Sequence, residues 1–382
     1  MKLALIRAKY NPFGGAERFL NDAVAALAGS DLNVQPTLFT REWPAQASPS
    51  PSAILTHRIV NPPYTTSNGR DRGFAEAVSA AFAAEKFDLV QSYERIAGCD
   101  IYHCVDGVHA EWLRQRGRIT GGLRKLGIAI NPRHRFVLAS ERAMYLSPRF
   151  KAAICISEMV KTDILRHVDI APTKLHVIYS GVDTEKFSPA SRGPFGDVTR
   201  QKLCIPTDVT VAVFVGSGFE RKGLAAFLQA LALCKNIVGV VVGQDKHSAR
   251  YRTMAQKLGI QDRVHFTGGV SDTRPYYAMA DVFVLPTIYE PFGLVCLEAM
   301  ACGLPVVTST SAGAAELIVD GVNGYVTDAL DVAAISRAME QSVAPTAHAA
   351  MSIAARETAL TFSPQTMADQ YVALYRKLLA GR

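Results

Sequence analysis

The chain has 382 residues, 49% of them hydrophobic and 20% charged, which excludes a disordered protein and predicts two domains rather than one. It contains no run of about 18 uncharged apolar residues, and its seven scattered cysteines form no C-x-x-C pair. We therefore expect no membrane-spanning helix, no zinc site and no disulfide framework, as in a cytoplasmic protein.

Net charge is +7, and residues 1–150 carry nineteen lysines and arginines against thirteen acidic residues. A basic N-terminal part can face nucleic acid, an anionic membrane or a phosphorylated substrate, and composition does not choose among these.

In chain order, short apolar runs alternate with helix-length segments, which predicts a mainly parallel sheet with crossover helices. The first run, Leu3–Ile6, is too short for the core of a signal peptide and is predicted to be a buried strand. The other strands predicted in the first half are Val34–Phe39, Leu89–Ser92, Ala152–Ile156 and His176–Tyr179.

A second series of strands follows the segment Thr184–Asp208, which is rich in Pro, Gly and Ser and is predicted to be an interdomain linker. The strands predicted here are Val209–Val215, Val238–Val242, Val264–Phe266, Val282–Leu285 and Val306–Thr308. Gln365–Leu379, with apolar residues Met367, Tyr371, Leu374 and Leu378 at helical spacing, is predicted to be a closing helix. Doubly wound sheets bind ligands beyond the carboxyl ends of their strands, so the loops after the strands are the expected sites of chemistry.

The loop after the first strand contains Gly14 and Gly15 at the start of a helix. Two glycines there allow a ligand close to the backbone, and the free N–H groups attract an anion; a plain tight turn is the competing interpretation. The loop lacks the G-x-G-x-x-G fingerprint, which counts against a dinucleotide-dependent oxidoreductase.

Residues 111–135 carry seven cations against one carboxylate, interleaved with apolar side chains. This pattern is typical of a peripheral segment that meets anionic lipid, with cations at the headgroups and apolar groups in the interface. A solvated basic helix is the competing interpretation. No recognised nucleic-acid motif accompanies the segment, so no nucleic-acid partner is expected.

Arg221 and Lys222 stand between the first strand of the second half and the helix predicted to begin after Gly223. Two cations at such a turn predict a pyrophosphate site. The competing interpretation is a solvated basic pair at a helix start, where the helix dipole disfavours cations. A Walker loop is excluded, because Leu224 and Ala225 stand where that motif has Lys and Ser or Thr.

Glu290 and Glu298 are separated by seven residues, with Gly293 and Leu294 opening a helix between them. We expect Glu290 to lie in the loop just before the helix. One carboxylate can then accept hydrogen bonds from sugar hydroxyls and the other from ribose hydroxyls. The amides at Gly293 and Leu294 would face phosphate, whereas the competing interpretation is two unrelated surface glutamates.

In this order, the segments resemble the retaining glycosyltransferases of family four, which have the GT-B fold. The residues that carry the resemblance are Gly14-Gly15, Ser180-Gly-Val-Asp183 with Phe187, Arg221-Lys222-Gly223, Glu290, Glu298 and Gly303-Leu-Pro305. The segments YNPFGGAER, GSGFERKG and VVGQDK are most similar to lipopolysaccharide core glucosyltransferases of Gram-negative bacteria.

The resemblance implies an α/β fold of two Rossmann-like domains that face each other across a cleft. Residues 1–184 and 365–382 would form the acceptor-binding domain, and residues 185–364 the domain that binds the nucleotide-sugar. The closing helix would cross back to the first domain.

The family also implies roles for individual residues. Arg221 and Lys222 would neutralise the donor diphosphate, Glu290 would orient the transferred sugar, and Glu298 would bind the ribose. Gly15 would approach the diphosphate from the first domain, with Gly14 beside it. The stretch CVDGVHAEW places Asp106 and His109 together in a loop of the acceptor domain, where many members have a histidine near the sugar.

The implied reaction moves a hexose, glucose from UDP-glucose, to a glycan or glycolipid acceptor such as the lipopolysaccharide core. No Asp-x-Asp occurs to hold a metal, so Arg221 and Lys222 are expected to replace one, and no cofactor is expected beyond the nucleotide-sugar. The enzyme would be cytoplasmic and attached to the inner membrane through residues 111–135. The alternatives are an exopolysaccharide or other acceptor, or a non-catalytic membrane-associated module; oligomeric state and stereochemical mechanism stay open.

Overall fold

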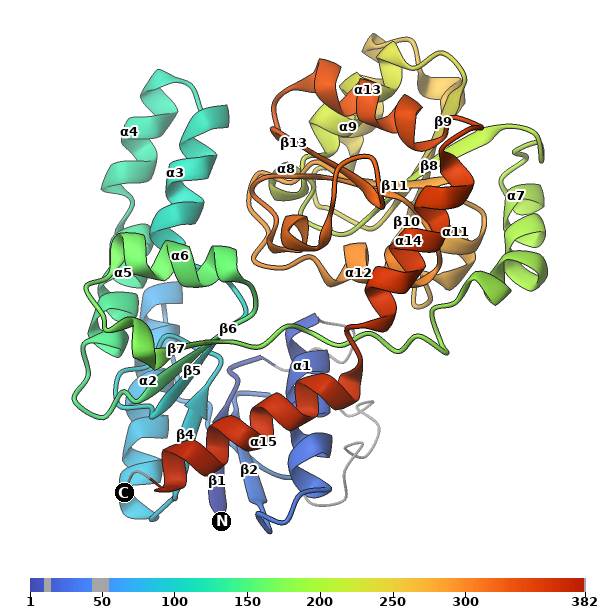
Figure 1. Ribbon diagram of the computed structural model, residues 1–382. Coiled ribbons are helices and arrows are strands. Elements are labelled where there is room, and N and C mark those ends of the chain that lie inside the picture. Colours follow the sequence, from blue (N-terminus) through green and yellow to red (C-terminus); the bar gives the residue numbers. More distant parts are fainter. Residues whose placement is uncertain (10–14, 43–54, 381–382) are drawn as a thin grey trace. The chain divides into compact units, whose positions relative to one another are not determined.

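The structure is a computed structural model that describes residues 1–9, 15–42 and 55–380 (Figure 1). The chain divides into an N-terminal unit, Met1–Ser180 with Pro364–Arg382, and a C-terminal unit, Gly181–Ser363. The predicted boundaries lay at 184/185 and 364/365, and the structure has them at 180/181 and 363/364. Each unit is described by itself below.

In the described part of the N-terminal unit, seven parallel strands pair in the order β3-β2-β1-β4-β5-β6-β7. Their bounds are β1 Lys2–Ile6, β2 Gln35–Thr40, β3 Thr56–Ile59, β4 Leu89–Ser92, β5 Ile101–Cys104, β6 Ala152–Cys155 and β7 Leu175–Val177. The predicted strands at β1, β2, β4, β6 and β7 are confirmed within a few residues. Two strands were missed: β3 is exposed at all four residues, and β5 carries a histidine within a short buried run.

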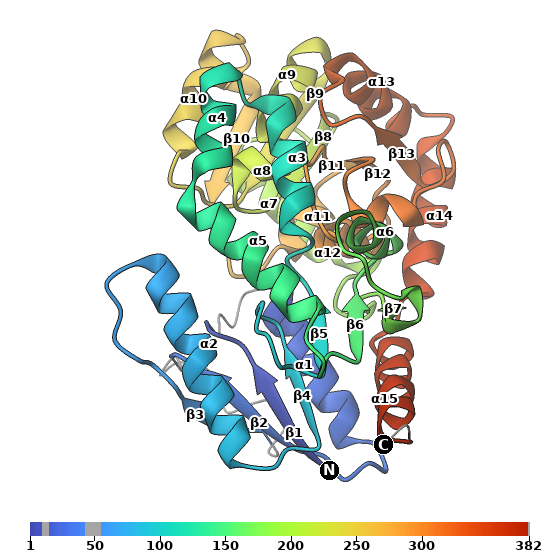
Figure 2. The ribbon, with the colours of Figure 1, turned by 90° about the vertical axis from the view of Figure 1, so that its left-hand side faces the viewer.

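Helices cover both faces of this sheet, with α2 on one face and α1 and α15 on the other (Figure 2). The α-helices of the unit are α1 Gly15–Ala28, α2 Ser67–Ala84, α3 His109–Ile119, α4 Gly122–Ile130, α5 Pro132–Tyr145, α6 Glu158–His167 and α15 Pro364–Ala380. A short 3-10 helix, η1, spans Pro172–Lys174. The helices α3 and α4 stand clear of the sheet as a pair (Figure 1).

The closing helix α15 belongs to the N-terminal unit and packs against α1, as the predicted fold requires. The predicted closing helix is confirmed; Met367, Tyr371 and Leu374 are buried on it, and Leu378 is half-exposed. The Tyr371 hydroxyl lies 3.2 Å from Nε2 of His103 on β5. Burial, helped by a nearby arginine, lowers the pKa of His103 to about 3, so a neutral imidazole meets the phenol.

The C-terminal unit, described throughout, has six parallel strands in the order β10-β9-β8-β11-β12-β13. They are β8 Thr210–Val215, β9 Ile237–Val242, β10 Val264–Gly268, β11 Val282–Leu285, β12 Val306–Ser309 and β13 Gly324–Thr327. The five predicted strands are confirmed, and β13 was missed. Gly324 opens β13 because a Cβ there would lie 2.0 Å from the carbonyl oxygen of Val306.

The α-helices of this unit alternate with its strands. They are α7 Asp197–Lys202, α8 Phe219–Lys222, α9 Leu224–Leu233, α10 Ser248–Lys257, α11 Arg274–Ala278, α12 Leu294–Ala301, α13 Val332–Ser342 and α14 His348–Leu360. Short irregular helices are η2 Pro189–Ser191, η3 Arg192–Gly196, η4 Gln261–Arg263 and η5 Gly313–Leu317.

The predicted linker Thr184–Asp208 is wrong, because the segment is a folded part of the C-terminal unit and contains η2, η3 and α7. Arg200 on α7 is 8% exposed, pairs with Asp281 at 3.0 Å and donates to the carbonyl of Met279 at 2.9 Å. The buried Arg200 holds this segment in place rather than an apolar face, so hydrophobic periodicity does not show that the segment is folded.

Both sheets reverse their strand order at one point, between β1 and β4 in the N-terminal unit and between β8 and β11 in the C-terminal unit. At such a switch point the connections leave in opposite directions, which opens a crevice beyond the carboxyl ends of the two strands. Each unit therefore has one favoured place for a ligand.

Candidate active site

The cations Arg221 and Lys222 follow β8 at the switch point of the C-terminal unit. They directly precede Gly223 and α9 as predicted, and they lie in the last turn of the short helix α8, which was not predicted. Gly223, with φ of +77°, turns the chain from α8 into α9, which begins at Leu224 as predicted. A Cβ on Gly223 would lie 1.8 Å from the carbonyl oxygen of Pro286, so only glycine fits.

Glu290, from the loop after β11, lies between the two cations. Its Oε2 accepts from Arg221 Nη1 at 2.9 Å and lies 2.8 Å from Lys222 Nζ. Burial alone would raise the pKa of Glu290, but the charges of Lys222 and Arg221 outweigh it and lower the pKa to about 2. Three residues predicted from two separate segments thus form one ionised cluster.

Backbone contacts fix this cluster. The carbonyl of Arg221 accepts from the Thr287 hydroxyl and from the Ile288 amide, both at 2.8 Å. A Cβ at Gly216 would lie 2.4 Å from Lys222 Cδ, which shows that the lysine side chain crosses over that glycine. Sequence reasoning missed Thr287 and Gly216; the GSG tripeptide after β8 was the available signal for the second.

The segment VVGQDK also supports the cluster. Asp245 accepts from the amide of Phe219 at 3.0 Å, which satisfies a free N–H at the start of α8. Asp245 therefore holds the helix that carries both cations.

Glu298 lies on α12 and is 3% exposed. Its Oε2 accepts from the Tyr277 hydroxyl at 2.9 Å. Gly293 caps the helix with φ of +96° and Leu294 is its first residue, so Glu290 lies in the preceding loop as predicted. The two glutamates therefore have different partners.

In the N-terminal unit the structure does not join the two predicted residues into a pair. Asp106 follows β5 and lies 4.0 Å from Arg95, whereas His109 begins α3 and its Nε2 lies 3.1 Å from Nδ1 of His134. Within the described residues, no hydrogen bond or ion pair links Asp106 to His109. Gly15 begins α1, and Gly14 lies outside the described residues.

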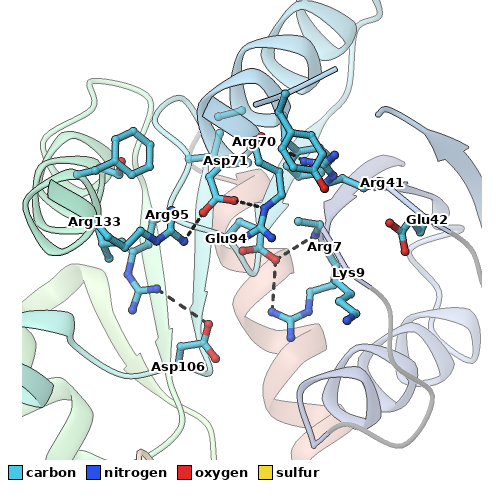
Figure 3. Close-up of a pocket in the computed structure, with 18 residues that line it drawn as sticks. Arg7, Lys9, Arg41, Glu42, Arg70, Asp71, Glu94, Arg95, Asp106 and Arg133 are labelled. Carbon is cyan, nitrogen blue, oxygen red and sulfur yellow. Dashed lines mark hydrogen bonds and ion pairs between the residues drawn. The ribbon is translucent and has the colours of Figure 1, made fainter. Parts of the chain in front are cut away.

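A cavity of about 520 Å³ lies at the carboxyl ends of β1 and β4, and we call it the N-terminal pocket (Figure 3). Asp106 lines it, together with six cations that were not predicted as site residues: Arg7, Lys9, Arg41, Arg70, Arg95 and Arg133. They follow three strands, β1, β2 and β4, or lie on two helices, α2 and α5, so no single local pattern in the sequence predicts them together.

The basic stretch 111–135 covers α3, α4 and the start of α5. Ile119, Leu126 and Ile130 are 37%, 61% and 64% exposed. Several cations of this stretch have partners within the unit: Arg114 pairs with Glu111 at 2.5 Å, Arg118 donates to Gln115 at 3.4 Å, and Arg133 pairs with an aspartate of α2. Across the described ranges, no helix combines the length and the apolar character needed to cross a membrane.

Two families of glycosyltransferases match the chain. Residues 13–186 match "Glycosyltransferase Family 4", and residues 197–358 match "Glycosyl transferases group 1". The two matches cover the N-terminal and C-terminal units in turn, and the chain belongs to the glycosyltransferases of the GT-B fold. It is an enzyme of the transferase class, as the motifs predicted.

Among known proteins, the chain is 29% identical to the lipopolysaccharide glucosyltransferase WaaG of Escherichia coli (strain K12), over 85% of each chain. The crystal structure of WaaG matches with a TM-score of 0.81 and 26% identity, over 97% of this chain and 99% of that one. Anabaena Alr3699/HepE in complex with UDP-glucose has the same fold, with a TM-score of 0.74 and 22% identity over 99% and 100% of the two chains.

Proposed function

We propose that the chain is a retaining hexosyltransferase that moves glucose from UDP-glucose to a glycan or glycolipid acceptor such as the lipopolysaccharide core. The observation that carries the proposal is the convergence of Arg221 and Lys222 on Glu290 at the switch point of the C-terminal unit. The similarity to WaaG supports the sugar and the acceptor class, and the UDP-glucose complex of HepE supports the donor.

In the transfer, the bond between the anomeric carbon and the diphosphate oxygen breaks, and its electron pair stays on the phosphate. The acceptor oxygen forms the new bond to carbon and releases its proton. Cations held near the departing oxygen stabilise the developing charge, and each charge-assisted hydrogen bond contributes about 1.5–3 kcal/mol. Lys222 is 11% exposed and is oriented by Glu290, with which a diphosphate would compete.

The same two side chains take the part that a metal ion has in other sugar transferases, and no cofactor joins the nucleotide-sugar. The test measures UDP release from UDP-glucose with and without EDTA, and in the Lys222→Ala variant. Turnover is expected to survive EDTA and to fall strongly in the variant. Loss of turnover in EDTA with recovery on adding magnesium would overturn the metal-independent assignment.

We also propose that the enzyme works in the cytoplasm, attached to the inner membrane through residues 111–135. The exposed apolar side chains on α3 and α4 support this, since such groups enter the lipid interface while cations face the headgroups. Co-sedimentation with vesicles of phosphatidylglycerol is expected to exceed that with phosphatidylcholine. Leu126→Ser should weaken it, and Leu146→Ser, at a 52% exposed leucine after α5, should not. Equal binding to both vesicles would remove the proposal.

A further inference from the structure

We infer that the N-terminal pocket binds a phosphate group carried by the sugar acceptor. The inference rests on the proposed function, because it takes a sugar as the other part of the ligand. The pocket lies at the switch point of its own sheet, where a doubly wound fold places a ligand. Its volume of about 520 Å³ exceeds the space that a lone anion fills and is within the range of small-molecule sites.

The charges that line the pocket do not balance. Its six cations face four carboxylates, which are Glu42, Asp71, Glu94 and Asp106 (Figure 3). Arg70 and Arg133 share a single partner, Asp71, and the first of these contacts measures 2.8 Å. Arg95 also pairs at 2.9 Å with the buried Glu141, which does not line the pocket. Six cations thus meet five carboxylates, and a surplus of positive charge remains.

Two further carboxylates of the pocket are bound to cations other than Arg41 and Lys9. Glu94 accepts from Arg7 Nη1 at 3.4 Å, and Asp106 lies 4.0 Å from Arg95. Burial and the nearby Asp106 raise the pKa of Glu94, against the charge of Arg7.

The strongest support for an anionic ligand comes from Arg41. It is 7% exposed, and no carboxylate of the described residues forms an ion pair with it. Its guanidinium donates to two neutral oxygens, the carbonyl of Arg70 at 3.3 Å and the side chain of Asn61, and lies 4.6 Å from the ring centre of Tyr64. A buried charge without a counter-charge is unfavourable, so an anionic ligand is the missing partner.

Lys9, from the chain that follows β1, adds a second positive charge at the pocket. It is exposed, and among the described side chains no carboxylate pairs with it. A phosphomonoester has a charge of about −1.5 to −2 at pH 7, which matches Arg41 and Lys9 together, whereas a carboxylate has only one charge. The aromatic walls Tyr64, Phe74 and Phe136 offer apolar faces to a sugar ring.

The experiment titrates the full chain with glucose 6-phosphate, glucose and inorganic phosphate by calorimetry. Excess UDP is present, so that the cations of the C-terminal unit are occupied. Glucose 6-phosphate is expected to bind at least about tenfold more tightly than either glucose or phosphate, the effect of one or more charge-assisted hydrogen bonds.

Variants locate the site. Lys9→Gln should weaken the binding of glucose 6-phosphate by about tenfold. Because Lys9 is exposed, the substitution should leave folding unaffected. Arg142→Gln, which removes an exposed charge from α5 outside the pocket, is the matched control and should bind as the wild type does. Arg41→Lys keeps the buried charge but loses the planar fork, and should also weaken binding.

Three outcomes would overturn the inference: equal affinity for glucose and glucose 6-phosphate, wild-type affinity in Lys9→Gln, or inorganic phosphate binding as tightly as the sugar phosphate. Lys222→Ala, which changes only the C-terminal unit, should keep the affinity for glucose 6-phosphate. If that affinity survives while UDP-glucose is never turned over, the proposed function fails and the phosphate site stands.

Discussion

Replacing Glu290 by Gln removes one negative charge and almost no volume, so it isolates the electrostatic role of this carboxylate. A pKa of about 2 in place of the ordinary 4.5 means that the folded site favours the ionised form by roughly 3 kcal/mol. Glu290 is 13% exposed, so solvent screening reduces this value little. The variant should therefore lose about 3 kcal/mol of unfolding free energy at pH 7.

The sign of the pH dependence follows from the direction of the shift. The folded-state pKa lies below the unfolded one, so the stabilisation is complete above about pH 4.5 and is lost as the pH falls towards 2. Urea unfolding of both proteins should show a difference that shrinks over this range. Glu357→Gln, at an exposed glutamate of α14, is the control and should be neutral. A difference that stays constant down to pH 2.5 would refute the ionised cluster.

The same variant separates binding from turnover. Without the carboxylate, Arg221 and Lys222 are free for the diphosphate, so UDP should bind about tenfold more tightly. Turnover of UDP-glucose should fall by about a hundredfold, because Glu290 would no longer orient the sugar. Calorimetry with UDP and steady-state kinetics measure the two effects. Weaker UDP binding in Glu290→Gln would show that the phosphates lie elsewhere.

Three further outcomes are expected. Lys222→Ala should lower kcat by about 10- to 100-fold with little change in acceptor KM. An unchanged kcat in steady-state assays would show that the phosphate site lies elsewhere. Gly223→Ala should lose about 3 kcal/mol or more in thermal unfolding, because its Cβ meets the carbonyl of Pro286 at 1.8 Å; Gly218→Ala, also left-handed but in open space, should lose only about 1–2 kcal/mol. Burial, reinforced by a nearby arginine, lowers the pKa of His109 to about 4, so the unfolded chain takes up its proton first and stability is lost as the pH falls from about 6.5 to 4. His109→Gln should flatten this part of the stability curve, and an imidazole NMR titration near 6.5 would contradict the shift.

Elements that local chemistry determines were predictable from the sequence. Central strands such as β9 and β11 are continuous apolar runs, because helices cover a doubly wound sheet on both faces. The position of Arg221 and Lys222 after β8 and of Glu290 after β11 followed from the rule that ligands bind beyond strand ends. That these three side chains meet at one point depends on the order of the strands in the sheet. The alternation of strands and helices predicts a parallel sheet but not its full strand order.

What could not be predicted depends on contacts between distant segments. Nothing near Arg41 in the sequence predicts that it is buried, since its burial depends on Tyr64 and on α2. The segment Thr184–Asp208 likewise has no apolar period, because an ion pair between Arg200 and Asp281 holds it in place. Charge networks of this kind have no sequence period and become visible only in three dimensions.

The two switch points use cations in different ways, and the difference has a functional consequence. In the C-terminal unit the chain supplies its own anion, because Glu290 lies within 2.9 Å of both cations. A diphosphate that binds there competes with this carboxylate, and when it leaves, the internal ion pairs form again. Under the proposed function, Glu290 would weaken the binding of the UDP product and keep both cations oriented. In the N-terminal unit Arg41 has no such internal partner among the described residues, so its anion must come from the ligand. Under the two proposals, one site releases its anion after each turnover, and the other selects an acceptor by its charge.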